Sequence, residues 1–322
     1  MKRFILRTEV GVVLVLHVML GLAIAAPPAI GTVTAGGAFR LNGDTVLANG
    51  TLTEGAVLES GRGNSSVRLA GGARLFLGAD SRGKLYSDHI VLEKGETYLE
   101  KGVGFHLEAL GLTIRPDRGL STGQIGLVGS RRLRVAALTG SFRVLNARGV
   151  LIANVAAGSA LAFEPQTPAD AAVTHITGTL SQRNGHFLLT DEVTRVTVEV
   201  TGQRLAPYVG QVVGVTGALN IAATSVAAAS QVIAASHVQT TAAAVSADSI
   251  SVVGGVAAVA TVDQSAFAGA FSAQAKGDPV GPPAAPPGKP PGRPPVTPPG
   301  PPPAPPGRPP DRPPVSPPGL SR

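Results

Sequence analysis

The sequence predicts an all-β protein, and three observations carry this prediction. From residue 27 onward, short runs of alternating apolar and polar residues recur about every 8–12 residues, as in Ser66–Leu69 and Ala73–Leu77. Glycines fall between these runs, where turns need positive φ. Helical periodicity is absent from residues 27–165, so no crossover helices fit between the strands. We therefore expect a sandwich, barrel or β-solenoid.

An export signal precedes these strands and occupies residues 1–25. Three positive residues within the first seven are followed by Val10–Ala25, which holds no charge and ends in the small-x-small pattern Ala23–Ala25. This run of about 16 residues is shorter than the roughly 20 of a comfortable bilayer span. We expect cleavage after Ala25, since a cut one residue later would leave Pro27 immediately beyond it. The alternative is an uncleaved N-terminal anchor, oriented by the same positive charges.

The first predicted domain spans residues 27–165. Its strand patterns include Ala38–Leu41 and Ser141–Leu145, each with one apolar face. An ordered series of glycine turns and aliphatic strands runs through this region: Gly31–Val33, Gly43, Gly55–Gly61, Ser66–Leu77, Ser81, Leu92–Gly95, Gly140–Val144, Gly149 and Val155–Gly158.

This series resembles the extracytoplasmic β domain of the FecR family. That family's pattern opens with G-x-V, continues through a G-x-x-L-x-x-G turn and a strand of x-L-x-L type, and reaches a Ser and an L-x-x-G turn. The resemblance implies a β domain that binds a partner outside the cytoplasm. FecR regulators also carry a cytoplasmic helical anti-sigma segment, whereas only Met1–Glu9 precede the apolar run here. We therefore expect no direct control of a sigma factor.

A second β unit is predicted over residues 174–240. Its strands are expected near 176–180, 186–191, 195–200, 210–217 and 231–233, with the hairpin signal Asn184-Gly185 after the first strand. Residues 205–209 suggest a short helical turn. About 65 residues in five strands resemble the small OB-like barrels of exported bacterial proteins.

Residues 241–275 form an Ala-rich connector. The run 250–260 carries no charge, but Asp263 interrupts the apolar composition. In a membrane span this carboxylate would lie near the middle of the bilayer, at a cost of roughly 2.5–3.5 kcal/mol. We expect a marginal helix on a surface or loosely at a membrane, with a true span as the alternative.

Residues 276–322 form a proline-rich tail, which holds 22 of the 28 prolines. Proline has no amide donor and builds no core here, so this tail is predicted to be disordered and to favour polyproline II. The tail lacks a strict glycine at every third position, so its sequence is not that of a collagen triple helix. The tail carries six Lys/Arg against two Asp, which makes it a cationic spacer of charge +4.

The charge distribution argues against a nucleic-acid partner. Of the net charge of +7, the tail contributes +4 and residues 1–26 contribute +2, which leaves about +1 for residues 27–275. A nearly neutral body with 4% aromatic residues offers neither a basic face nor stacking platforms. The absence of cysteine excludes disulfides, thiolate metal sites, cysteine nucleophiles and a lipoprotein anchor.

No motif predicts catalysis. Gly78–Lys84 has phosphate-loop spacing, but Leu85 stands where Ser or Thr would bind magnesium, so a β-turn is expected. No G-x-S-x-G elbow occurs. The histidines lack metal-binding spacing, and we expect each to be an isolated strand-surface or core residue: His17, His89, His106, His175, His186 and His237.

Three further patterns have simple structural explanations. The duplicated Leu-Glu-Lys-Gly at 92–95 and 99–102 predicts two solvated hairpin turns, with an acidic and basic contact patch as the alternative. Asn49 and Asn64 begin glycosylation sequons that matter only if the host glycosylates them. Pro303–Arg308 fits one proline-rich ligand pattern, which chance explains in so proline-dense a tail.

We therefore predict a non-enzymatic, periplasmic or secreted bacterial envelope protein that binds a protein or polysaccharide, with membrane association left open. It is expected to have no catalytic residues, metal or cofactor. The alternative is a structural or adhesin-like protein whose tail holds it to anionic envelope polymers. A hydrolase that uses scattered carboxylates is a third class, with no motif to support it.

Overall fold

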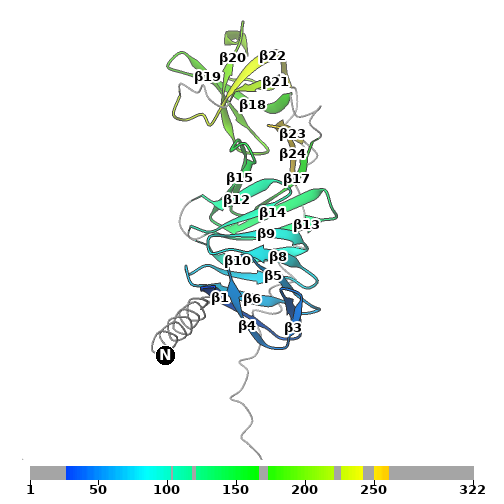
Figure 1. The fold of residues 1–322 in the computed structure, drawn as a ribbon. Helices are drawn as coiled ribbons and strands as arrows, with labels where there is room; N and C mark the ends of the chain where they lie inside the picture. The colour runs from blue at the N-terminus through cyan, green and yellow to red at the C-terminus, as the bar shows by residue number, and fades with distance from the viewer. Residues whose placement is uncertain are drawn as a thin grey trace, which may run out of the picture. The chain divides into compact units, whose positions relative to one another are not determined.

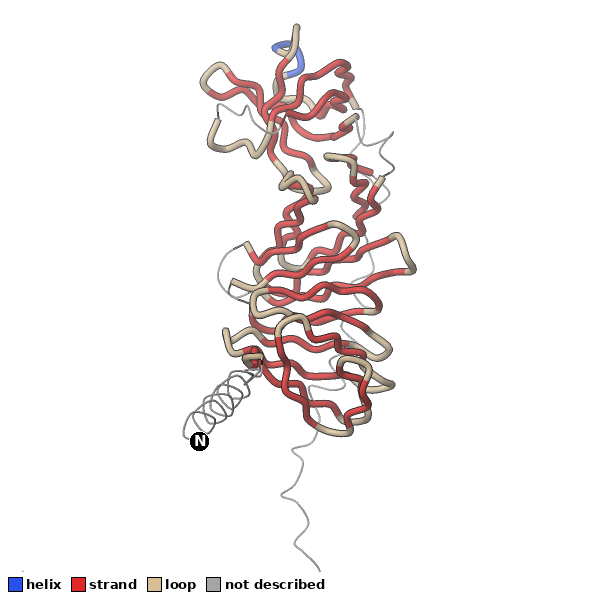
Figure 2. The backbone as a smooth tube through the Cα atoms, in the orientation of Figure 1, coloured by secondary structure: helices blue, strands red, loops and turns tan. Residues whose placement is uncertain are grey.

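The computed structural model describes residues 27–102, 104–117, 121–166, 173–220, 226–241 and 250–260. Within these ranges the chain forms 24 β-strands and one short 3-10 helix, η2 (Ala206–Tyr208). Figure 2 shows strand and loop almost throughout. The all-β prediction is confirmed, and η2 lies where the helical turn was expected. The signal segment 1–25 and the tail 276–322 lie outside the described residues, so their assignments stay predictions.

Residues 29–165 fold into two antiparallel layers (Figure 1). Strands of the first layer, sheet A, are ordered β4 (Asn49–Thr53), β1 (Ala29–Ala35), β6 (Ser65–Leu69), β7 (Arg74–Leu77), β10 (Glu96–Lys101), β13 (Thr122–Val128), β14 (Arg132–Thr139) and β17 (Ser159–Pro165). Strands of the second layer, sheet B, are ordered β3 (Asp44–Val46), β2 (Phe39–Leu41), β5 (Ala56–Glu59), β8 (Arg82–Leu85), β9 (His89–Lys94), β11 (His106–Ala109), β12 (Leu112–Pro116), β15 (Ser141–Asn146) and β16 (Leu151–Ala156).

The chain fills this sandwich by changing sheets repeatedly. The hairpin β6–β7 lies in sheet A, β8–β9 in sheet B, β13–β14 in sheet A and β15–β16 in sheet B. Because strands are added in this sequential order, nearly all pairs are antiparallel. The pair β9–β11 is parallel, since β10 leaves for sheet A between them.

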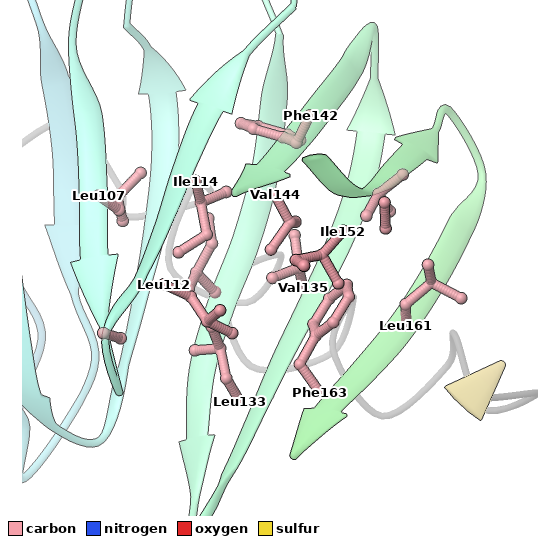
Figure 3. Close-up of a cluster of buried hydrophobic side chains, with 14 of the residues drawn as sticks. Leu107, Leu112, Ile114, Leu133, Val135, Phe142, Val144, Ile152, Leu161 and Phe163 are labelled. Atoms are coloured by element: carbon pink, nitrogen blue, oxygen red, sulfur yellow. The ribbon is translucent and has the colours of Figure 1, made fainter. Parts of the chain in front are cut away.

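The interior between the sheets is aliphatic. Strand alternation points Leu107, Ile114 and Val144 from sheet B toward Val135 and Phe163 from sheet A, and all five are fully buried (Figure 3). Each buried side chain of this kind contributes about 1.5–3 kcal/mol of hydrophobic free energy. Since the chain has no cysteine, this burial and the strand hydrogen bonds supply the cohesion.

Buried serines satisfy the backbone where the chain crosses between sheets. Ser60 follows β5, and its Oγ donates to the carbonyl of Gly78 and accepts from the Ser81 amide at 3.0 Å. Ser81 precedes β8, and its Oγ accepts from the Glu96 amide at 2.9 Å. Gly95, at the next crossing, has φ +78° and lies so close to Ser81 that a Cβ would collide with it.

The second unit is a closed five-stranded barrel, as the sequence predicts. Its strands are β18 (Thr174–Arg183), β19 (His186–Asp191), β20 (Thr197–Thr201), β21 (Val212–Asn220) and β22 (Val232–Thr240). The order around the barrel is β18-β19-β20-β22-β21, closing on β18, and β20–β22 is its parallel pair. Asn184 and Gly185 have φ of 51° and 82° and make the predicted tight turn between β18 and β19.

The described part of the connector forms a hairpin, which corrects the expected helix. β23 (Ile250–Val253) pairs with β24 (Val256–Ala260) around Gly254 and Gly255. β24 also pairs with β17, and β23 meets β18 at the single register pair His175–Val252. Residues 242–249 and 261–275 lie outside the described residues. Val and Ala form strands readily once a neighbouring strand supplies hydrogen bonds, so tertiary pairing outweighs local preference here.

A turn of the barrel covers the last strand of sheet B. The Asn154 amide on β16 donates to the Thr194 carbonyl at 2.7 Å, and Asn154 Nδ2 donates to the Arg195 carbonyl at 3.2 Å. Gln231 Nε2 donates to the Leu151 carbonyl at 3.2 Å. These three hydrogen bonds pair part of the β16 edge with the barrel.

We predict that Gly72→Val destabilises the fold by about 1–2 kcal/mol, while Gly71→Val has a small effect. Gly72 has φ +87°, whereas Gly71 is not in the left-handed region. A Cβ added to Gly71 would have one neighbour within 4 Å, the Ser87 carbonyl oxygen at 3.8 Å. Chemical denaturation of the two variants measures the difference. Equal stability of both would contradict the argument from positive φ.

Proteolytic cleavage between Pro165 and Thr174 should leave two fragments that stay together. The second fragment carries β24, which pairs with β17 of the first over five register positions. Two bands on a denaturing gel with one peak in native size exclusion is the expected result. Fragments that separate without denaturant would show that the two units are held only by the covalent linker.

Candidate binding face

Three rings stack on the outer surface of sheet B. His89 opens β9 and His106 opens β11, and the parallel register of these strands places the two residues side by side. Tyr86 follows β8, and its amide donates to the His89 carbonyl at 2.8 Å. Alternation directs Ile90 and Leu107 inward, so the neighbouring histidines face outward.

The rings form a nearly parallel column. The centroids of Tyr86 and His89 lie 4.2 Å apart with planes inclined by 10°. Those of His89 and His106 lie 4.9 Å apart, inclined by 17°. The His89 and His106 side chains are 21% and 16% exposed, so their edges reach solvent while their faces are covered by one another.

Each imidazole is oriented by a carboxylate. His89 Nδ1 donates to Asp88 Oδ1 at 2.7 Å, and His106 Nε2 donates to Glu108 Oε1 at 3.3 Å. The Lys84 ammonium lies 5.4 Å from the Tyr86 ring centroid, and its hydrogen bond with Tyr86 raises the pKa of Lys84. The hydrogen bond from His89 lowers the pKa of Asp88. The face thus combines flat rings with fixed acceptors and one cation.

An ion-pair ladder continues this polar surface across the neighbouring strands. Arg82 on β8 contacts Glu59 at 3.0 Å through Nη1 and Glu93 at 2.7 Å through Nε. These pairs are partly exposed, so their main effect is to hold side-chain positions rather than to stabilise the fold.

The stack corrects the expectation that every histidine is isolated. His89 and His106 meet because two strands pair across an intervening strand of the other sheet, which local sequence patterns do not reveal. The remaining described histidines are separate from this stack. His186 Nδ1 donates to the buried Glu199 at 2.9 Å, and a 2.9 Å hydrogen bond joins His175 to Thr216.

The phosphate-loop-like segment, the duplicated Leu-Glu-Lys-Gly motif and the sequon at Asn49 lie in turns and strands of the sandwich. Residues 78–84 make the expected turn into β8, with Asp80 at φ +52° and no helix in the described chain around it. Residues 92–95 do not form a hairpin turn, because Gly95 joins sheet B to sheet A, and Gly102 is buried. Asn49 is exposed at the start of β4.

The described residues contain no group of three or more His, Asp or Glu side chains placed to hold a metal ion. In the same part of the chain, no helix is long and apolar enough to cross a membrane. No protein-family model matches the sequence, and the search of curated proteins found no similar protein.

We predict that His89→Ala raises the pKa of Asp88 toward that of an ordinary exposed Asp. The lowered pKa means that the contact stabilises the fold above the ordinary Asp range and is lost as the pH falls below about 4. NMR titration of the Asp88 carboxyl resonance measures the shift. His175→Ala, which removes a histidine of the barrel, is the control, and an unchanged Asp88 titration in His89→Ala would contradict the hydrogen bond.

Proposed function

We propose that this protein is a non-enzymatic binding protein of the bacterial cell envelope, built from a FecR-like sandwich and an OB-like barrel. The glycine positions support the FecR-like assignment. Gly43, Gly55, Gly72 and Gly95 all have positive φ, which gives a backbone reason for glycines in the family's turn pattern. The predicted export signal supports a periplasmic or secreted location.

The strand order supports the OB-like assignment of the barrel. With β18 as the first strand, the order is 1-2-3-5-4 closing on 1, with strands 3 and 5 parallel. This is the Greek-key arrangement of OB barrels, which use one sheet face and adjoining loops to bind oligonucleotides or oligosaccharides. A nearly neutral body favours the saccharide class over nucleic acid.

The observation that carries a binding function is the ring column of Tyr86, His89 and His106 with its carboxylates. The exposed ring edges contact the C–H surfaces of a sugar, while Asp88 and Glu108 accept hydrogen bonds from hydroxyl groups. Lys84 adds a donor at the same surface. The partner class that fits this chemistry best is an envelope polysaccharide.

A structural or adhesin-like role is the second candidate, and the charge distribution favours it. The tail carries +4 beside a nearly neutral body, so it suits nonspecific contact with anionic envelope polymers. Such contacts weaken as the Debye length falls from about 10 Å at 0.1 M salt to about 3 Å at 1 M. The two candidates therefore differ in salt dependence.

Cosedimentation of the mature protein with isolated peptidoglycan and envelope polysaccharide separates the candidates. If the ring column binds, Tyr86→Ala combined with His106→Ala should weaken the salt-resistant binding by about tenfold. His237→Ala, at an exposed histidine of β22, is the matched control. Neutralising the tail cations by Lys/Arg→Gln should remove only the binding that 1 M salt releases.

Salt-resistant binding that survives loss of both rings would contradict the polysaccharide face. Binding that vanishes entirely at 1 M salt and with the neutral tail would favour the structural role. Binding lost through His237→Ala alone would transfer the site to the barrel.

A further inference from the structure

Two arginines face each other on the strands next to the ring column. Arg115 on β12 and Arg143 on β15 are directly opposed in the antiparallel register. Their chain neighbours Ile114 and Val144 point into the core (Figure 3). Because side chains alternate along a strand, both arginines lie on the outer side of sheet B, and both are exposed. We call Arg115 and Arg143 the arginine pair.

The arginine pair continues the row of stacked rings across sheet B. In the core, the register of β11 and β12 pairs Leu107 with Ile114. One position further along the same register, Arg115 lies opposite His106, the last ring of the column. Neighbouring strands are about 4.8 Å apart, so the backbone of Arg143 lies about 10 Å from that of His106. The rings and the two cations therefore form one continuous surface.

The charge of the arginine pair is only weakly compensated within the described chain. Like charges directly opposite each other destabilise a sheet, so a bound anion would stabilise this arrangement. Arg143 Nε lies 3.9 Å from Asp117 Oδ1, and the two side chains are 45% and 36% exposed. No carboxylate of the described residues forms an ion pair with Arg115. The Glu108 carboxylate, on the neighbouring strand, accepts from His106 instead.

A third arginine lies beyond the pair, on the barrel turn that contacts β16. Asn154 is paired across to Arg143, and its Nδ2 donates to the Arg195 carbonyl at 3.2 Å. This hydrogen bond holds the backbone of Arg195 against the outer side of sheet B. Arg195 is exposed and has φ +57°, a conformation uncommon for residues other than Gly, Asn and Asp. The barrel turn thus adds a cation at the end of the row.

We propose that this surface binds an acidic polysaccharide, with anionic groups on the arginine pair and sugar rings along the ring column. This inference rests on the proposed saccharide-binding function and names its substrate class. The planar guanidinium fork matches a carboxylate or a phosphate, so an anionic group between two arginines gains charge-assisted hydrogen bonds. Single-stranded nucleic acid fits less well, because its bases stack on open ring faces, whereas the His89 ring is stacked on both faces.

Binding of acidic and neutral polymers with matched backbones tests the proposal. Polygalacturonate is compared with its methyl ester, and a phosphorylated mannan with unphosphorylated mannan, which distinguishes carboxylate from phosphate as the anionic group. The full mature chain carries Lys/Arg→Gln at its tail cations in this experiment, so that the tail cannot supply the charge. We expect at least one acidic polymer to bind about tenfold more tightly than its neutral counterpart.

Substitution of the arginine pair should remove this preference. Arg115→Gln combined with Arg143→Gln is expected to weaken binding of the acidic polymer about tenfold and to leave the neutral polymer unchanged. Thermal unfolding without polymer should show no loss of stability, since the substitutions remove a like-charge pair. Arg68→Gln combined with Arg74→Gln is the matched control and should leave both polymers unchanged. These two arginines are also directly opposed, on β6 and β7 of sheet A, and Arg74 also has one carboxylate at 3.9 Å, that of Glu100.

Four results would overturn the proposal. Equal binding of acidic and neutral polymers, weakened only by Tyr86→Ala with His106→Ala, would keep the saccharide face and remove the anionic group from its ligand. Failure of all four polymers to bind would contradict the proposed saccharide function as well. A preference lost only in the control variant would transfer the anion site to sheet A. Tighter binding of a single-stranded oligonucleotide than of either acidic polymer would replace the polysaccharide by nucleic acid.

Discussion

The fold depends on repeated crossing of the chain between two sheets that enclose one aliphatic interior. Every crossing brings polar backbone close to that interior, where an unpaired group would cost about 1–3 kcal/mol. Ser81 is 1% exposed and lies in such a crossing, where its hydroxyl accepts from the Glu96 amide. Ser121, at 0% exposure, does the same for the Ser141 amide at another crossing. These serines let a chain without cysteine change sheets beside a buried aliphatic core.

Local sequence patterns predicted the features that local chemistry determines. The strand runs, the Asn184-Gly185 turn and the five-stranded second unit follow from alternation and from positive φ at glycine. The hairpin at 250–260 was mistaken for a helix, because its Val and Ala residues show no period and its strands depend on pairing with β17. The meeting of His89 with His106 was missed for a related reason. The two histidines share a parallel register because the chain crosses to sheet A in β10 before it returns to sheet B in β11. Neither residue carries a local sequence signal of this crossing.

The strands that end each sheet are treated differently at the two ends of the sandwich. Beyond β17, sheet A continues through β24 and β23 to the barrel, and the barrel turn at Thr194 covers β16 of sheet B. At the other end, β3 and β4 are the last described strands of their sheets. They are three and five residues long, and such short edges offer little backbone for pairing with another chain. The late hairpin thus closes the one end where longer strands would stay unpaired.

Both outer faces of the sandwich carry ion pairs, and sheet B adds a column of stacked rings. Sheet B presents the Tyr86 ring column and the Arg82 ion pairs, whose polar groups remain soluble without a partner. Sheet A presents the ion pairs of Arg74 with Glu100 and of Arg132 with Glu164 on its outer side, beside the small residues Ala136 and Ala162.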